Sequence, residues 1–245
     1  MSEIAAEVAP VNPIKKQARI AGLLYALVAV TGPVSLVYIP GKLFIAGDAM
    51  GAADRIRASE SLLRLGIASE LFYQTIEVFL ILVLYRLFKA VNKPLARQMA
   101  VLGLLPIPIV FLNVLNEIAA LTLVNGPNFL AVIGPKQLGA LATLFVALHG
   151  QGLQLAEIFW GLWLFPFGLL IIRCGFIPKA LGALVIVAGA GYLIGAAVSL
   201  VVPYYASHLG VFTGVLELGE PAIILWLLIW GAKVQSANSL FASSR

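Results

Sequence analysis

Residues 61–86 read "SLLRLGIASELFYQTIEVFLILVLYR". A run of about 20 predominantly apolar residues is long enough to cross the hydrocarbon core of a bilayer as a helix. This run nevertheless contains Glu70, Gln74 and Glu77. An ionised carboxylate is costly to bury where water is scarce, so it normally pairs, binds a cation or holds a proton. The stretch therefore predicts a membrane-spanning helix that carries a polar site.

The composition of the whole chain supports a membrane protein. Of the 245 residues, 61% are hydrophobic and 11% are charged, whereas about 25% are charged in an average soluble domain. With a mean hydropathy of +1.02, the chain is expected to be a single all-α, polytopic membrane domain in contact with lipid. The basic residues flank apolar runs, so they indicate membrane orientation, and we expect no nucleic-acid partner. The single cysteine, Cys174, leaves no internal disulfide.

Apolar segments of spanning length recur along the chain and predict a bundle of six transmembrane helices. They lie near residues 19–40, 62–86, 98–124, 138–173, 179–203 and 209–232. The fourth is too long for one span, so its start, "QLGALATLFVALHGQG", is expected to be an outer arm that meets the span near Gly150 and Gly152. The first run is expected to be retained, because no small-residue cleavage site ends it. The membrane domain would then cover residues 18–233, between tails at 1–17 and 234–245.

Basic residues are distributed unequally between the two ends of the predicted helices. One end holds Lys15, Lys16, Arg19, Arg86, Lys89, Lys93, Arg97, Arg173, Lys179, Lys233 and Arg245, and the other holds Lys42, Arg55, Arg57, Arg64 and Lys136. Because cytoplasmic loops are enriched in Lys and Arg, both termini are predicted to be cytoplasmic.

Two outer loops carry local structural signals. The segment "GDAMGAADRIRASE" at 47–60 predicts a short surface helix that Asp48 caps. Gly-Pro pairs in "VNGPNFLAVIGPK" at 124–136 predict an irregular loop. The apolar stretches "LFIAG" at 43–47 and "FLAVIG" at 129–134 would be poorly placed in free solvent, so we expect them to fold over the polar site as a lid.

Six of the eleven acidic residues fall within or at the edges of the predicted spans. They are Glu70, Glu77, Glu117, Glu157, Glu217 and Glu220. Each of Glu70, Glu157 and Glu217 precedes a basic residue by 16 positions, which places it about 24 Å from the cytoplasmic end of its helix. Asn113 follows Arg97 by the same interval. Four helices are therefore predicted to offer polar groups at one depth.

Helical spacing also collects these residues into stripes. Glu70, Gln74 and Glu77 share one face, and so do Asn113, Asn116 and Glu117, and Gln154 with Glu157. We predict an outward-open polar cavity with Glu70, Glu157 and Glu217 at its core and His149 at its mouth. The candidate ligand- or proton-binding residues are Glu70, Gln74, Glu77, Asn113, Glu117, Gln154, Glu157, Glu217 and Glu220.

Several functions are compatible with such a site. Acidic groups that exchange protons or bind a cation suit a small-molecule or ion binder or transporter, which could act as a homodimer because the chain is short. Alternatively, Glu70, Glu157, Glu217 and His149 could bind a metal ion in an intramembrane enzyme. A sensor or assembly subunit remains a third possibility, and packing bonds alone a fourth. The chain lacks the common phosphate-binding, hydrolase and zinc motifs, and no cofactor can be named.

Three stretches resemble a known family. They are "ARIAGLLYALVAV" at 18–30, "GDAM" followed by "LLRLGIASEL" at 62–71, and "IFWGLWLFPFGLLIIRCGFIPKALGALVIVAGAGYL" at 158–193. Together they resemble the bacterial membrane family catalogued as domain of unknown function 4386, over about residues 17–233. The resemblance implies an integral protein of the bacterial cytoplasmic membrane and implies no particular activity.

Overall fold

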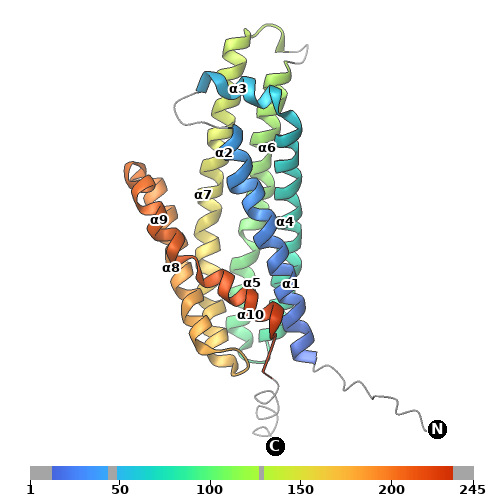
Figure 1. Cartoon of the computed structure of the whole chain (residues 1–245), viewed down its shortest axis with the longest axis vertical. Helices are drawn as coiled ribbons and strands as arrows, with labels where there is room; N and C mark the ends of the chain where they lie inside the picture. Colours follow the sequence, from blue (N-terminus) through green and yellow to red (C-terminus); the bar gives the residue numbers. More distant parts are fainter. Residues whose placement is uncertain (1–12, 44–48, 127–129, 234–245) are drawn as a thin grey trace, which may run out of the picture.

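The computed structural model describes residues 13–43, 49–126 and 130–233, and these residues form helices joined by turns. Figure 1 shows an elongated bundle with most helices along its long axis. Six helical segments are long and apolar enough to cross a membrane, which confirms the predicted number of spans. They are Pro13–Leu43, Glu60–Phe88, Lys93–Asn125, Pro135–Cys174, Lys179–Val201 and His208–Ile229.

The first span changes its helical form in the middle. Helix α1 (Pro13–Pro33) continues through a π-helical turn, η1 (Val34–Tyr38), into α2 (Ile39–Leu43). Pro40 has no N–H group to donate to the carbonyl of Leu36, and its ring crowds the turn that precedes it, which accounts for the wider turn directly before Pro40. The predicted cap residue Asp48, and the 44–47 part of the predicted lid, lie outside the described residues.

The predicted surface helix is present as α3 (Ala49–Ala58). It lies across one end of the bundle (Figure 1), and its Ile56 side chain is fully buried there. Helix α4 (Glu60–Phe88) then crosses the bundle without interruption. The third span consists of α5 (Lys93–Leu104) and α6 (Pro106–Asn125). A new helix begins at Pro106 because proline is favoured in the first turn of a helix and disfavoured in its interior.

Helix α7 (Pro135–Cys174) is the longest element of the bundle. Its 40 residues correspond to about 60 Å of helix, twice the thickness of a hydrocarbon layer of about 30 Å. The predicted outer arm is the upper part of this same helix, and the helix continues through Gly150 and Gly152 without a break. The neighbouring α8 (Lys179–Val201) makes the most extensive contacts with α7.

The sixth span is divided at a pair of polar residues. After a 3-10 turn at Pro203–Tyr205, α9 (Ala206–Leu216) and α10 (Gly219–Ile229) meet at Glu217 and Leu218. Pro221 has no N–H group to donate to the carbonyl of Glu217, and that carbonyl instead accepts from the Glu220 N–H at 3.1 Å. Figure 1 shows the change of direction between α9 and α10.

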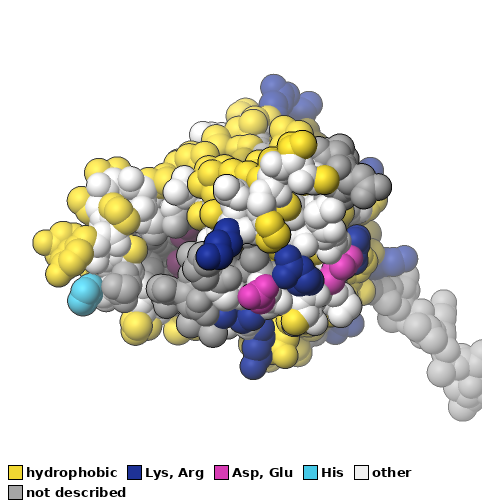
Figure 2. Space-filling view, turned by 90° about the horizontal axis from the view of Figure 1, so that it is seen from above, with side chains coloured by type: hydrophobic (Ala, Val, Ile, Leu, Met, Phe, Trp, Pro, Cys, Tyr) yellow, Lys and Arg dark blue, Asp and Glu magenta, His cyan; other side chains and the backbone are white. Residues whose placement is uncertain are grey.

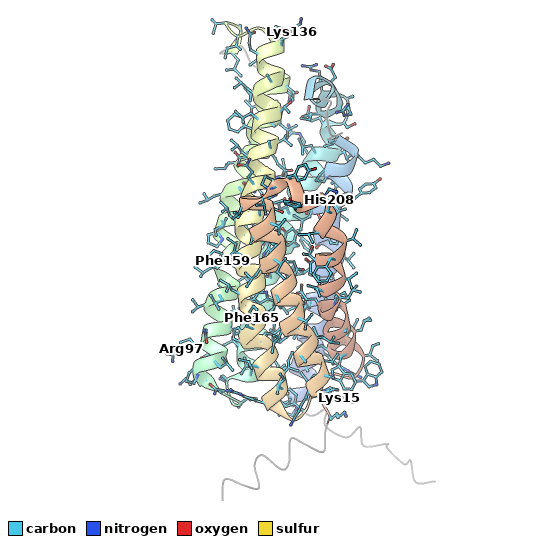
Figure 3. The ribbon with its side chains drawn as sticks, turned by 90° about the vertical axis from the view of Figure 1, so that its left-hand side faces the viewer. Lys15, Arg97, Lys136, Phe159, Phe165 and His208 are labelled. Carbon is cyan, nitrogen blue, oxygen red and sulfur yellow. The ribbon has the colours of Figure 1, made fainter. Side chains whose placement is uncertain are left out.

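Two apolar clusters fill the bundle at different heights. One contains Leu80, Phe88, Trp163 and Phe167, and the other contains Ile39, Ile56, Leu63 and Ala142. Basic residues mark both ends, since Lys15 and Arg97 lie at the end opposite to Lys136 (Figure 3). Figure 2, an end view, shows charged side chains on the end face and hydrophobic ones around its edge. This is the distribution expected of a bundle surrounded by lipid.

Candidate functional site

A layer of polar side chains lies between the two apolar clusters. Six of them, on α4, α6 and α7, each expose 7% or less of their surface. They are Glu70, Gln74, Glu77, Asn113, Glu117 and His149. The other four candidates, Gln154, Glu157, Glu217 and Glu220, are half-buried. The polar stripes therefore turn away from lipid, as expected, while a binding role for these residues stays a prediction.

The first group within this layer joins three helices. His149 Nε2 on α7 lies 3.2 Å from Glu70 Oε1 on α4 and 4.0 Å from Glu117 Oε2 on α6. One ligand atom from each of these residues lies within 4.8 Å of the others. The second oxygen of Glu70 and Oε2 of Glu117 have no hydrogen-bond partner among the described residues. We call Glu70, Glu117 and His149 the carboxylate–histidine trio.

The backbone beside the trio is held by an asparagine. Asn113 Nδ2 donates a hydrogen bond of 2.8 Å to the His149 carbonyl, and Asn116 Nδ2 donates one of 3.0 Å to Asn113 Oδ1. Gly152, one turn below His149, leaves room for this contact, because a Cβ atom there would collide with the Asn113 amide. The bond fixes α6 against α7 at the level of His149.

The second group lines a cavity of about 460 Å³ between α1, α4, α7, α8 and the broken sixth span. Three carboxyl groups contribute to its wall, those of Glu77, Glu217 and Glu220. The aromatic lining residues are Tyr25, Tyr73, Trp160, Trp163 and Tyr192. A volume of this size is typical of small-molecule sites. We call it the acidic aromatic cavity.

Glu220 is the most firmly held carboxyl group of this cavity. Tyr25 on α1 donates a hydrogen bond to Glu220 Oε1, and Tyr192 on α8 donates one of 2.6 Å to Oε2. Hydrogen bonds to a carboxylate from hydroxyl donors are short and strong when the acceptor is charged. The two tyrosines therefore fix the position of Glu220 at the start of α10.

The rim of the cavity lies between the first span and the broken sixth span. Val37 in η1 and Leu218 at the break are lining residues that expose 68% and 62% of their surface. Ala29 on α1 and Gly214 on α9 are exposed lining residues as well. These rim residues are apolar, so this side of the opening is compatible with contact to lipid.

Glu157 lies beside the acidic aromatic cavity but is not one of its lining residues. It is near enough to Glu217 and Tyr192 to interact with them electrostatically. A Cβ atom on Gly195 of α8 would lie 2.9 Å from its Oε1 atom. Gln154, one turn above Glu157, is part of neither the trio nor the cavity wall.

The predicted grouping of Glu70, Glu157 and Glu217 in one cavity is wrong. Glu70 belongs to the trio with His149, and Glu217 lines the acidic aromatic cavity. The depth of each glutamate was predicted from its distance along the helix to a basic residue. That prediction assumes that equal distances on α4 and α7 give equal depths, and they do not. His149, which pairs with Glu70, precedes Glu157 by eight residues, so Glu157 lies about 12 Å deeper. For the same reason, His149 is in the polar layer and not at the mouth of a site.

The predicted lid is also wrong for the described part of the 129–134 loop. Val132 exposes 94% of its surface. This loop lies at the outer end of α7, where His149 is 14 residues below Pro135, or about 21 Å along the helix. The long outer part of α7 carries the loop away from the polar layer.

Three tyrosines that complete the cavity are not among the site residues predicted from the sequence. Tyr25, Tyr73 and Tyr192 lie in apolar runs and offer hydroxyl groups that require partners within a membrane. A tyrosine in the middle of a span is a signal that could have identified Tyr25 and Tyr192. Trp160 and Trp163 have no such signal, because tryptophan is common in packing and at membrane interfaces.

Comparisons with known proteins identify the family. A segment of the chain is 37% identical over 87 residues to a protein of Archaeoglobus fulgidus that carries the name "Uncharacterized protein". The match covers 36% of this chain, and the chain spans about half (51%) of that relative. No solved structure matches the chain. The model of the family described as "Domain of unknown function (DUF4386)" matches residues 20–231. This chain is a multi-pass membrane protein that belongs to the DUF4386 family.

Proposed function

We propose that this protein binds a small organic cation with an apolar part in the acidic aromatic cavity and carries it across the membrane. The observation that carries the proposal is the wall of this cavity, which combines three carboxyl groups with five aromatic residues. Carboxylates attract a positive charge, and aromatic faces bind ammonium groups without requiring hydrogen bonds. A protonated or quaternary amine satisfies both properties.

The apolar rim favours a ligand with a hydrophobic substituent. Val37 and Leu218 border the opening between the first and sixth spans. An amine with an aryl or alkyl group can partition toward this rim, whereas a strongly hydrated metal ion has no polar ligands there. The tyrosine-bound Glu220 supplies a fixed anion deeper in the cavity.

The broken sixth span supports transport rather than static binding. Transporters commonly place discontinuous helices at their substrate sites, because the helix ends and the unwound backbone at a break can face the substrate. Here Glu217 lies at the break and Glu220 in the first turn of α10. Release of the cation would leave carboxyl groups that are costly to keep ionised, so protons replace it.

We further propose that the protein resides in the cytoplasmic membrane of a bacterial cell with both termini inside. Support comes from the resemblance of its sequence to a bacterial membrane family and from the excess of basic residues at one end of the bundle. Lipid contact at the apolar helix surfaces is part of the same proposal.

The binding test compares two probes of the same shape. Benzyltrimethylammonium carries a charge, and neopentylbenzene is its neutral carbon isostere. Calorimetry on the full chain in nanodiscs should show at least tenfold tighter binding of the cation. Glu220→Gln should weaken binding of the cation at least tenfold, because Gln keeps the shape and loses the charge. The control Asp54→Asn, at an exposed position of α3, should bind normally.

The aromatic contribution can be measured separately from the charge. Replacing Trp160 by Leu should weaken binding of benzyltrimethylammonium by about twofold to thirtyfold, corresponding to about 0.5–2 kcal/mol for a cation–π contact. Uptake of the labelled cation into proteoliposomes then tests transport. Binding without uptake would refute the carrier and leave a sensor, and equal affinity for both probes would refute the cation site.

A further inference from the structure

We propose that Glu70, Glu117 and His149 form a binding site for a divalent transition-metal ion, represented by Zn²⁺, that is separate from the acidic aromatic cavity. None of these three residues lines that cavity. Each comes from a different helix, α4, α6 or α7. An ion held by all three would tie these helices together in the middle of the bundle.

The distances within the trio fit metal ligands. His149 Nε2 lies 3.2 Å from Glu70 Oε1 and 4.0 Å from Glu117 Oε2, and the ligand atoms span at most 4.8 Å. Two ligands bound at about 2.1 Å from a tetrahedral ion lie about 3.4 Å apart. Small side-chain rotations are therefore enough to bring the three atoms onto one ion.

Unpartnered buried atoms point independently to a ligand at this place. Glu70 and Gln74 expose 0% of their surface, and Glu117 exposes 4%. Glu70 Oε2, Glu117 Oε2 and both amide atoms of Gln74 have no hydrogen-bond partner among the described residues. Each unsatisfied buried polar group costs about 1–3 kcal/mol, so a group of them requires compensation.

Charge favours a divalent cation over a hydrogen-bond network alone. Two buried carboxylates that lie close together repel each other, and a single protonated histidine balances one of them. A divalent ion neutralises both carboxylates and accepts the neutral imidazole as a third ligand. Nε2 is the ligand nitrogen, because it is the histidine atom that faces both carboxyl groups.

The ligand set also predicts selectivity. Imidazole suits Zn²⁺ and its first-row neighbours, whereas Mg²⁺ prefers an all-oxygen shell and retains several waters. Asn113 on α6 is a positioning residue, because its amide donates a hydrogen bond to the backbone carbonyl of His149 on α7. We therefore expect Zn²⁺ to bind and Mg²⁺ not to compete with it.

The test measures metal in the full chain. Protein stripped with a chelator and reconstituted in nanodiscs should take up one Zn²⁺ per chain, with no displacement by excess Mg²⁺. Glu70→Gln, Glu117→Gln and His149→Asn should each lower the affinity at least about tenfold, since loss of a supporting group alone costs about 10- to 100-fold. His208→Gln changes the other histidine of the chain and should bind Zn²⁺ normally.

Two further measurements keep the outcome unambiguous. Co²⁺ bound to the wild type should give visible d–d bands that Glu117→Gln, a shape-preserving change, alters or abolishes. Glu220→Gln should retain Zn²⁺ binding while its binding of benzyltrimethylammonium is weakened, which separates this site from the proposed carrier site. Wild-type protein that binds no Zn²⁺ above the level of the three variants, or equal loss in His208→Gln, would overturn the proposal.

Discussion

A methyl group at Gly152 would collide with the amide of Asn113, which holds α6 to α7 beside the carboxylate–histidine trio. Gly152→Ala should therefore displace Asn113 and break its hydrogen bond to the His149 carbonyl. A buried polar group that loses its partner costs about 1–3 kcal/mol. We expect a lower melting temperature for this variant, measured by the fluorescence of the protein in detergent.

Gly150→Ala provides the matched control for this substitution. It lies two residues away on the same helix, and a Cβ atom there meets nothing within 4 Å. Alanine favours helix over glycine by up to about 1 kcal/mol, so the melting temperature should stay the same or rise. Equal destabilisation by both variants would contradict the role assigned to Asn113.

The polar residues of α4 also show which part of the site can be predicted from the sequence. The prediction that Glu70, Gln74 and Glu77 face the interior is confirmed. It could be made from the sequence because helical spacing within a single helix places these residues on one face. Which stripes meet depends on the rotation and register of neighbouring helices. The contact between Glu70 and His149 could therefore not be predicted from the sequence.

The close approach of helices α7 and α8 depends on glycines that face one another. A Cβ atom on Gly189 would lie 2.8 Å from the carbonyl oxygen of Gly161, and the same holds in reverse. Gly168 and Gly182 repeat the arrangement one heptad away. Small residues at such interfaces allow membrane helices to pack backbone against backbone.

Gly189→Ala should separate α7 from α8, because the obstacle is a backbone atom that cannot rotate away. Overpacking of this kind costs about 1–3 kcal/mol, and the variant should melt at a lower temperature than the wild type. Gly210→Ala, on α9 where a Cβ meets nothing within 4 Å, is the control. Similar melting temperatures for the two variants would argue against the close α7–α8 contact.

The break between α9 and α10 is a second feature that can be tested as an element. Pro221→Ala restores an N–H group that can donate to the Glu217 carbonyl and join the two helices. We expect slower amide hydrogen exchange at residues 216–222 and weaker binding of benzyltrimethylammonium, because a straight helix would move Glu217. Pro166→Ala, within the continuous α7, should leave both quantities unchanged. Unchanged exchange in Pro221→Ala would assign the break to another cause.

The number of spans could be predicted from hydropathy, because a bilayer requires helices of a minimum apolar length. The same criterion overlooked the break in the sixth span, since Glu217 and Leu218 interrupt the helix without lowering its apolar character. The lid was expected because the apolar side chains of the 129–134 loop would be poorly placed in free solvent. That argument does not show that α7 stays continuous beyond the bilayer and holds the described part of this loop away from the site.

The orientation of the bundle is a prediction that the arrangement of charges makes testable. Lys15 and Arg97 lie at the end of the molecule opposite to Lys136 (Figure 3), and the loops with more Lys and Arg belong on the cytoplasmic side. In a Cys174→Ala background, an Asp54→Cys variant should react with a membrane-impermeant maleimide on intact cells. Lys93→Cys should react after the membrane is permeabilised and not before. Both positions are exposed, so the membrane alone limits access, and the opposite labelling pattern would place the termini outside.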